Sequence, residues 1–323
     1  MKDVVICLFA SPGFDKAAQG LTGAGRRLAD QLGGQLRAIV VGAGDEAVGT
    51  EVASLADTVV VADQGDMAEY QPETCLNVLT QLVKDAASRV ILLSNDTYSQ
   101  EIAPRLAHRL GGSAVGDGVD VQTAGEAVRV TRQVYGGKAQ AIIELKRYPA
   151  VVWLRSRSFA PAMERVAAVK ITHATLDVKA DTRIRIVERR QDASGKVRLE
   201  DARVIVAGGR GIGGPDPFIR ELQPLADQLG AQMAATRVAC DAGWVPVTWQ
   251  VGQTGKKVSP DLYLAIAVGG SSQHLAGISE AKNIAAINID PEADIFKHCR
   301  FGIVADYRKV VPLLREKLGI INK

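Results

Sequence analysis

The segment that decides the fold of the later half of this chain is an apolar run followed by glycines: Arg203-Val-Ile-Val-Ala207, then Gly208-Gly209-Arg210-Gly211-Ile212-Gly213-Gly214. A helical stretch from about Pro217 to Leu229 follows, so the order is strand, turn and helix. The pattern G-x-G-x-x-G is satisfied by Gly209, Gly211 and Gly214. Glycines there let the backbone turn with positive φ and let a diphosphate approach the amides at a helix start. The segment predicts a dinucleotide-binding turn, with a purely structural glycine turn as the alternative.

The residues after the next predicted strand differ from those of an ordinary NAD site. Such a site places an acid about 20 residues beyond the glycines, where it binds the ribose hydroxyls. Here that place reads Ala235-Thr236-Arg237. An arginine there could meet the 2′-phosphate of NADP, so an NADP-dependent oxidoreductase remains an alternative. It could also approach a ring system that becomes negative on reduction.

The flanking sequence predicts a two-domain α/β fold. Residues 1–188 alternate apolar runs with helical-period segments, which is the pattern of parallel strands covered by helices. Residues 189–202 are charged and show no apolar period, so they predict a linker. Residues 203–323 resume the alternation and predict a second α/β domain with a parallel sheet. Predicted strands are 4–9, 36–41, 58–62, 89–93, 127–134, 139–145, 151–155, 203–207, 233–238, 262–268, 284–289 and 302–305; predicted helices include 17–32, 217–229 and 307–318.

The N-terminal domain carries no dinucleotide motif of its own. Its first predicted turn, Ser11-Pro12-Gly13-Phe14-Asp15-Lys16, contains a single glycine and leaves little room for a second dinucleotide. We expect a nucleotide-binding-like scaffold that serves subunit contact.

Composition excludes several classes of protein. Lys and Arg number 39 against 36 Asp and Glu, a net charge of +3, so we expect no nucleic-acid partner. The apolar run from Val4 to Ala10 is far shorter than the roughly 20 residues of a membrane helix, so no transmembrane segment is expected. The cysteines form no C-x-x-C pair, which predicts a reduced, cytoplasmic compartment. Cys240, Cys299 and His298 lack zinc spacing, so no metal is expected.

The polar loops of the later half lack the spacing of known catalytic motifs. Gly252 to Lys256 is too short for a P-loop, and no G-x-S-x-G surrounds Ser271 or Ser272. The sequence therefore predicts ligand binding with no catalytic residue.

Several of these segments occur together in one known family. They are Gly208 to Gly214, Ala235 to Pro246, Gln250 to Lys256, Gln273 to Gly277, Ala286 to Ala293 and Ile303 to Asp306. In this order they closely resemble the α subunit of electron transfer flavoprotein, over about the last 120 residues. The N-terminal half is similar more loosely, through its first strand and helix and through Arg132 to Ala139.

The resemblance implies one subunit of a heterodimer with an electron transfer flavoprotein β subunit, in which residues 203–323 bind FAD. Such a protein is an electron carrier rather than a stand-alone catalyst. It shuttles electrons between dehydrogenases, of the acyl-CoA type or using NADH, and a downstream acceptor. A simple carrier and a bifurcating complex are both compatible with this chain.

The resemblance also implies which residues contact FAD. Arg210 and Thr236 would lie near the phosphates, and Arg237 beside the flavin ring. Gln253 and Thr254 would lie at the polar edge of the ring, with the Thr254 hydroxyl facing N5.

Other motif residues would complete the site. His274 would face the C2 carbonyl and N1, while Asn288 and Asp306 would hold the adenosine end. The family often has serine where this chain has Gly269, so contacts of that loop are expected to differ. The expected set is Arg210, Thr236, Arg237, Gln250, Gln253, Thr254, Gly270, Ser271, Ser272, Gln273, His274, Asn288 and Asp306.

Reduced flavin carries negative charge near N1 and the C2 carbonyl, so Arg237 and His274 are expected to raise its potential. Structural alternatives remain open. His274 could be a core histidine satisfied by the backbone, Asp306 a helix N-cap and Asn288 part of a turn. A subunit with a vestigial, colourless site is a third functional alternative.

Overall fold

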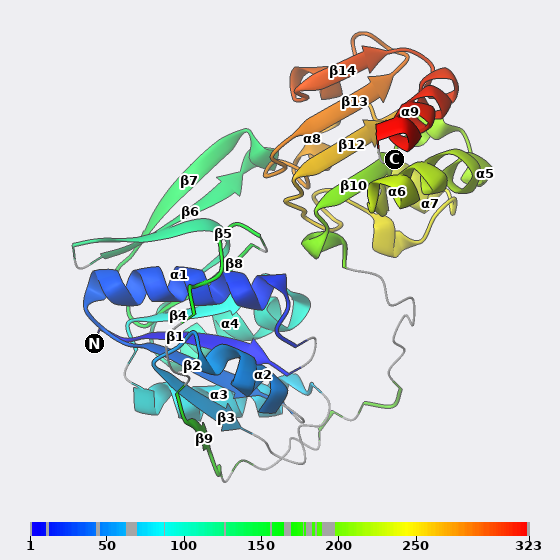
Figure 1. Ribbon diagram of the computed structural model, residues 1–323. Coiled ribbons are helices and arrows are strands. Elements are labelled where there is room, and N and C mark those ends of the chain that lie inside the picture. Colours follow the sequence, from blue (N-terminus) through cyan, green and yellow to red (C-terminus); the bar gives the residue numbers. More distant parts are fainter. Residues whose placement is uncertain are drawn as a thin grey trace. The chain divides into compact units, whose positions relative to one another are not determined.

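The computed structural model describes residues 2–10, 13–42, 46–62, 70–86, 88–125, 127–155, 157–164, 169–176, 178, 183–184, 186–188 and 198–321. The chain forms two compact units (Figure 1). The first comprises Met1–Gln133 and Gln140–Gln191, and the second comprises Val134–Ala139 and Asp192–Lys323. Residues 189–197 of the predicted linker lie outside the described residues, while Leu199 and Ala202 are buried in the core of the second unit.

The first unit contains a nine-stranded sheet with the order β7-β6-β5-β8-β4-β1-β2-β3-β9. In this order, all neighbouring strands from β5 to the β9 edge are parallel to one another. Strands β5 and β6 are antiparallel. The strands are β1 (Val4–Phe9), β2 (Leu36–Val41), β3 (Thr58–Ala62), β4 (Val90–Ser94), β5 (Ser113–Ala124), β6 (Ala127–Val134), β7 (Ala139–Leu145), β8 (Ala150–Leu154) and β9 (Ile171–His173). The helices are α1 (Lys16–Leu32), α2 (Glu46–Ala53), α3 (Pro72–Ala86) and α4 (Thr97–Arg109).

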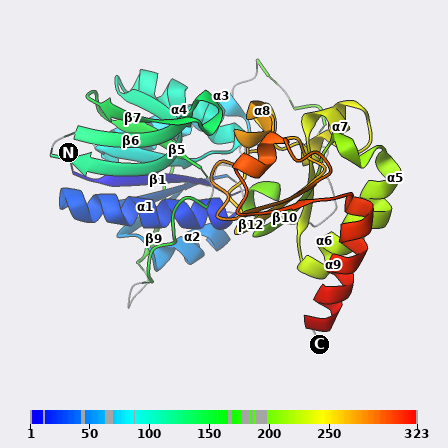
Figure 2. The ribbon, with the colours of Figure 1, turned by 90° about the horizontal axis from the view of Figure 1, so that it is seen from above.

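Helices cover both faces of the parallel part of this sheet (Figure 2). Every residue of β1 is buried, which explains why the strand is an unbroken apolar run. One set of alternate β1 side chains packs with α1 and α2, and the other set packs with α3 and α4. The sheet therefore forms the middle layer of the unit.

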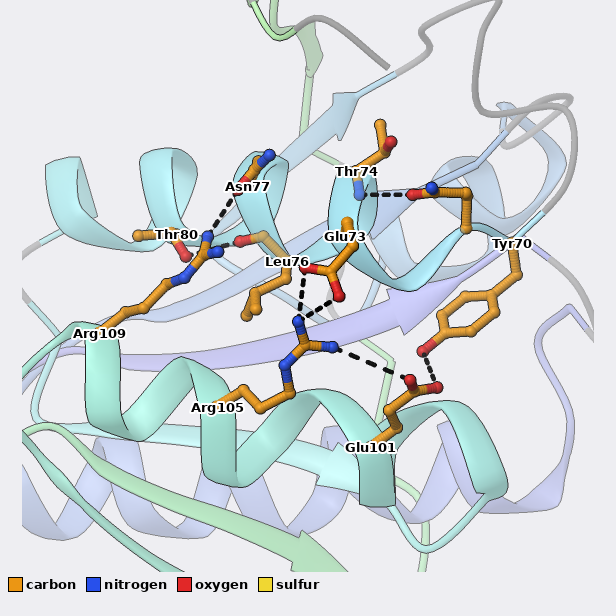
Figure 3. Close-up of polar contacts among 10 residues, drawn as sticks. Tyr70, Glu73, Thr74, Leu76, Asn77, Thr80, Glu101, Arg105 and Arg109 are labelled. Atoms are coloured by element: carbon orange, nitrogen blue, oxygen red, sulfur yellow. Dashed lines mark hydrogen bonds and ion pairs between the residues drawn. The ribbon is translucent and has the colours of Figure 1, made fainter. Parts of the chain in front are cut away.

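Polar contacts join α3, and Tyr70 just before it, to α4 (Figure 3). Arg105 of α4 donates to both carboxylate oxygens of Glu73, at 2.6 and 2.5 Å. Arg109 donates to the Asn77 side chain at 2.6 Å, and the Tyr70 hydroxyl donates to Glu101 at 3.1 Å. These bonds fix the register of the two helices.

The second unit contains a five-stranded, all-parallel sheet with the order β11-β10-β12-β13-β14. The strands are β10 (Val204–Gly208), β11 (Gln232–Ala235), β12 (Leu262–Ile266), β13 (Ile284–Asn288) and β14 (Phe301–Val304). The helices are α5 (Pro215–Pro217), a π turn (Phe218–Leu222), α6 (Gln223–Leu229), α7 (Arg237–Asp241), α8 (Ser272–Leu275) and α9 (Tyr307–Ile321), with short 3-10 turns at Tyr135–Gly137, Leu199–Asp201, Arg210–Ile212, Val247–Trp249 and Asp294–Lys297. One core lies against α6 and α9, and the other includes Tyr263 and α8.

The α/β fold class is confirmed, and most predicted strands lie within a residue of those observed. The strand predicted over 233–238 was wrong beyond Ala235, because α7 begins at Arg237 with Thr236 at its N-cap position. The helix predicted from Pro217 begins at Pro215 and contains the π turn. The π turn precedes Pro224, whose ring would clash with the Arg220 carbonyl in a regular α-helix.

The sequence did not predict two strands of the first unit. In β5 the pattern is broken by Gly116-Asp117-Gly118, where the pairing with β8 changes register. Strand β9 is a short edge strand of only three residues, parallel to β3. Both depend on pairing with distant segments, which local sequence patterns do not encode.

A buried ion pair holds the irregular part of β5. Asp117 accepts two hydrogen bonds from the Arg155 guanidinium, each of 2.8 Å, and their side chains are 7% and 3% exposed. Asp117 also accepts a bond of 3.3 Å from the Asn95 amide, and its φ is +60°. Because the pair is removed from water, loss of one charge takes a buried charged partner away from the other.

We expect Asp117→Asn to lower the free energy of unfolding by about 3 kcal/mol. Asparagine tolerates a positive φ, so the loss reflects the missing charge rather than the backbone. Asp120→Asn is the matched control: its partner Arg27 is 43% exposed, and exposed pairs contribute about 0–1 kcal/mol. Urea unfolding of both variants checks this, and equal losses would contradict it.

Candidate functional site

The glycine-rich turn lies at the point where the order of the second sheet reverses. The chain runs from β10 to β11 on one side, and then to β12 on the other side of β10. Open parallel sheets bind ligands outside the carboxyl ends of their strands at such a point. The predicted site residues lie at the end of β13 and in the segments that follow β10, β11, β12 and β14. All of them therefore belong to one edge of the sheet.

The glycine-rich turn packs directly against the end of β12. The Gly209 amide donates to the Ile266 carbonyl at 2.9 Å, and a Cβ on Gly209 would lie 2.1 Å from the Ala267 carbonyl oxygen. No side chain fits there. Packing alone therefore requires a glycine at position 209, as the alternative of a structural glycine turn predicts. The same close contact places the loop after β10 next to the loop after β12, beside the cavity described next.

A cavity of about 230 Å³ opens at this edge. Asn288 and Asp306, the two residues predicted to hold the adenosine end of FAD, both line this cavity. The other residues that line it are Gly211, Ile212, Gly213, Ala267, Ile287, Ile289, Ala305, Tyr307 and Arg308. The structure therefore gathers the glycine turn, the end of β13 and the start of α9 around one space.

The Asn288 side chain shapes the cavity wall. Its amide donates to the Val268 carbonyl at 2.9 Å, and its oxygen accepts from the Asp290 amide at 3.0 Å. The turn alternative for Asn288 is therefore present in the structure. The residue is 9% exposed, and its two bonds join the loop after β12 to the loop after β13.

Asp306 is held as a carboxylate. It accepts from the Arg308 backbone amide at 2.9 Å and from the Arg308 guanidinium, with a shortest contact of 2.6 Å. These bonds lower the pKa of Asp306 to about 2, so it is ionised at neutral pH. The N-cap alternative is thus realised, and the same carboxylate lines the cavity.

Thr236 and Arg237 follow β11. The Thr236 hydroxyl oxygen is buried and has no hydrogen-bond partner among the described residues. A buried hydroxyl without a partner is costly, and it fits a polar ligand that supplies the missing bond. Arg237 is 65% exposed and donates to Asp241 one helical turn later, at 3.1 Å. Arg210 is also exposed, at the start of the 3-10 turn.

Polar contacts anchor the loop from Gln250 to Lys256 at several points. Gln250 is 7% exposed and its amide donates to the Thr254 hydroxyl at 2.9 Å. The Gln253 amide donates to the Gln273 carbonyl at 2.7 Å, which joins the loop to α8. The Gln253 and Thr254 side chains are exposed at the loop tip. Lys256 bonds to Glu200 at 2.6 Å.

The loop before α8 contains the other predicted residues. Gly270 is buried with a φ of +84°, and Ser271 is the N-cap of α8, where its hydroxyl accepts from the His274 amide at 3.4 Å. Ser272 and Gln273 are exposed. Space around Gly269 is open, so the serine common in the resembling family would fit there without a clash.

His274 is a neutral, buried histidine. It is 4% exposed, and burial lowers its pKa to about 4. One ring nitrogen, Nδ1, lies 3.1 Å from the Val251 carbonyl oxygen, and the other, Nε2, lies 3.0 Å from the Tyr263 hydroxyl. His274 is therefore neutral at neutral pH, and its predicted position beside the flavin and its effect on the potential stay predictions.

Sequence reasoning missed three residues of the site. Tyr263 is fully buried in β12 and lies among apolar residues, so nothing in the pattern reveals its bond to His274. Tyr307 lines the cavity and donates to the Ile212 carbonyl at 2.9 Å. Asp241 stands four residues after Arg237, a spacing that signals an ion pair once α7 is assigned as a helix.

The described ranges contain neither a metal centre nor a membrane-spanning helix. Within those ranges, no three His, Cys, Asp or Glu side chains are grouped so that they could hold a metal ion. None of the helices in the part of the chain that the structure describes is long and apolar enough to cross a membrane.

Comparison with known proteins assigns both halves of the chain. Residues 12–179 match the electron transfer flavoprotein domain, and residues 198–279 match the electron transfer flavoprotein FAD-binding domain. The chain is 36% identical over 304 residues to electron transfer flavoprotein subunit alpha of Thermoanaerobacterium thermosaccharolyticum, covering 92% of each chain. It is 35% identical over 291 residues to the subunit alpha of Bacillus subtilis, covering 90% of this chain and 89% of that one.

A third relative agrees. The subunit alpha of Syntrophomonas wolfei is 36% identical over 292 residues, covering 90% of this chain and 92% of that one. The chain therefore belongs to the electron transfer flavoprotein family as a relative of its alpha subunits, with electron transfer as its role and a flavin as its cofactor.

Proposed function

We propose that this chain pairs with a beta subunit, that its second unit binds FAD along the carboxyl edge of β10 to β14, and that the heterodimer passes electrons from a dehydrogenase to a downstream acceptor. The dehydrogenase would be of the acyl-CoA type or use NADH. The observation that carries this proposal is the cavity of about 230 Å³ between the glycine turn, Asn288 and Asp306. We also propose a cytoplasmic location, supported by free cysteines at positions 7, 75, 240 and 299.

The donor set at this edge fits FAD. Asp306 is an ionised acceptor suited to ribose hydroxyls, and Thr236 has a buried hydroxyl that lacks a partner. Arg210 and Arg237 are exposed cations at the same edge, suited to the diphosphate and to a ring that gains negative charge. Gln250, Gln253, Thr254 and the segment from Gly270 to His274 would complete the site.

Bound FAD supplies the redox chemistry, taking up and releasing electrons. The protein residues bind it, orient it and set its electrostatic surroundings. Arg237 is the exposed cation proposed for the ring, and Asp241 moderates its charge through the ion pair at 3.1 Å. Because both side chains are more than half exposed, their influence is screened by water.

The NADP alternative is less well supported by the same geometry. A 2′-phosphate near Arg237 would also meet the carboxylate of Asp241, which already pairs with the guanidinium. Two negative groups would then compete for one cation.

The first test concerns the adenosine end. Asp306→Asn removes the charge but keeps the side-chain shape and an N-cap oxygen. We expect the dissociation constant for FAD to rise about tenfold, because a hydrogen bond to a charged group contributes about 1.5–3 kcal/mol. Asp294→Asn is the control, since Asp294 pairs with Lys297 and does not line the cavity. Titration of the apo heterodimer with FAD measures both; equal affinities for the two variants would contradict the assignment.

The second test concerns the flavin ring. Arg237→Ala should lower the midpoint potential by about 40 mV, which corresponds to about 1 kcal/mol for one electron. A fully effective charge at about 4 Å would contribute up to about 4 kcal/mol, and the exposure of Arg237 reduces that. Asp241→Asn should raise the potential, because it releases the guanidinium from its partner. Arg203→Ala is the control, because Arg203 is exposed and forms an ion pair with Asp261. Potentiometry at saturating FAD decides, and an unchanged Arg237→Ala potential removes Arg237 from this role.

The third test separates the functional alternatives. We expect the heterodimer to bind at least one FAD, counted by absorbance per protein, and the purified chain to show no tight binding of NADPH. A second flavin per heterodimer would favour a bifurcating complex. A colourless heterodimer in excess FAD would instead support the vestigial-site alternative, and strong NADPH binding without flavin would support the oxidoreductase alternative.

A further inference from the structure

We propose that Tyr263 and His274 form a buried positioning pair: the Val251 carbonyl sets the tautomer of His274, the Tyr263 hydroxyl donates to its other ring nitrogen, and the imidazole held in this way fixes the Val251 carbonyl and with it the loop from Gln250 to Lys256. The importance of this loop for a ligand rests on the proposed FAD site. The tautomer and the loop anchoring rest only on contacts within this chain.

The hydrogen-bond partners determine the tautomer. A backbone carbonyl can only accept, so Nδ1 of His274 must carry the proton that it shares with Val251 at 3.1 Å. In a neutral ring Nε2 then has only a lone pair, so the Tyr263 hydroxyl must donate to it at 3.0 Å. Burial raises the pKa of Tyr263, so the hydroxyl remains protonated and able to donate. All donors and acceptors of the pair are thus oriented in one direction, from Tyr263 to Val251.

The bond to Val251 anchors a tightly packed seam. Next to it, the Gln253 amide donates to the Gln273 carbonyl at 2.7 Å, and the Val258 amide donates to the Gly277 carbonyl at 2.8 Å. A Cβ on Gly252, whose φ is +149°, would lie 2.9 Å from the same Gln273 oxygen. The loop and the α8 segment therefore meet along their backbones, and His274 is the side chain that crosses between them.

This seam sets the position of two exposed side chains. Gln253 and Thr254 lie at the loop tip, and the Gln250 amide bonds to the Thr254 hydroxyl at 2.9 Å. Without the imidazole proton, the Val251 carbonyl would lose a buried partner, and the loop would lose one of its two ties to α8. An apolar side chain at position 274 would also leave the Tyr263 hydroxyl unsatisfied. The need to serve both groups explains a histidine at this buried position.

Two substitutions of His274 separate its two bonds. In His274→Asn the amide nitrogen can occupy the place of Nδ1 and keep the bond to Val251. In His274→Gln the longer side chain can reach the place of Nε2 and keep the bond to Tyr263, but not the bond to Val251. Tyr263→Phe removes the donor while keeping the ring. Tyr148→Phe is the control, because it removes a hydroxyl bond to the Leu145 carbonyl in the first unit.

The first measurement is nitrogen NMR of the apo heterodimer in which only this chain carries labelled histidine. We expect His274 in the wild type to be neutral with its proton on Nδ1. We expect Tyr263→Phe to keep the proton on Nδ1, because the Val251 carbonyl still accepts it, and to shift the resonance of Nε2, which loses its donor. A wild-type ring protonated on Nε2, or on both nitrogens, overturns the proposal without any need for a variant.

The second measurement is amide hydrogen exchange of peptides covering Gln253 to Lys256, again in the apo heterodimer. Exchange should accelerate at least tenfold in His274→Gln, which loses the bond to Val251, less than threefold in His274→Asn and Tyr263→Phe, which keep that bond, and not at all in Tyr148→Phe. Thermal melting shows that each variant is folded. Equal exchange in the Asn and Gln variants of His274 overturns the anchoring role.

FAD binding then tests the link to function. We expect affinity for FAD to fall five- to tenfold in His274→Gln, which frees the loop, less than threefold in Tyr263→Phe, and not at all in Tyr148→Phe. If the wild-type heterodimer binds no FAD, the proposed function fails, while the tautomer and exchange results stand by themselves. If it binds FAD and all variants bind equally well, the positioning role fails and the proposed function stands.

Discussion

The second unit depends on the close contact between two loops that leave adjacent strands, β10 and β12. The amide of Gly209 bonds to the Ile266 carbonyl, and the space beside it is too small for any Cβ. This contact brings the glycine turn next to Ala267 and so forms one wall of the cavity that also contains Asn288 and Asp306. The glycine at 209 is therefore required by packing, and the ligand site is a consequence of that packing.

In this site, whether a group is charged depends on how deeply it is buried. Buried groups are neutral: His274 shares its ring nitrogens with Val251 and Tyr263, and Thr236 offers a hydroxyl. Charged groups lie outside, where Arg237 pairs with Asp241 in water. Such an arrangement avoids the high cost of burying an unpaired ion. It also means that the surroundings of a bound flavin can be adjusted by surface substitutions that leave the core of the unit unchanged.

Much of the fold and part of the site followed from local sequence. The unbroken apolar run Val4–Phe9 gave β1, and the glycine pattern after Ala207 located the ligand edge. Asn288 and Asp306, which the family resemblance implied together, line one cavity. Strand β5 was missed because its burial comes from pairing with β8 rather than from its own pattern. The partner of His274 was missed because an alternating strand marks Tyr263 as buried but does not say which group its hydroxyl meets.

The chain passes between its two units more than once. Residues Val134–Ala139 belong to the second unit, although the strands β6 and β7 on either side belong mainly to the first. A Cβ on Gly137 of this excursion would lie 2.9 Å from the Ser279 side chain. A gene fragment that begins after the connecting segment would therefore encode the sheet and the cavity but leave the surface around Ser279 without its native cover. A single cut in the connecting segment thus leaves Val134–Ala139 on one fragment and the unit with which they pack on the other.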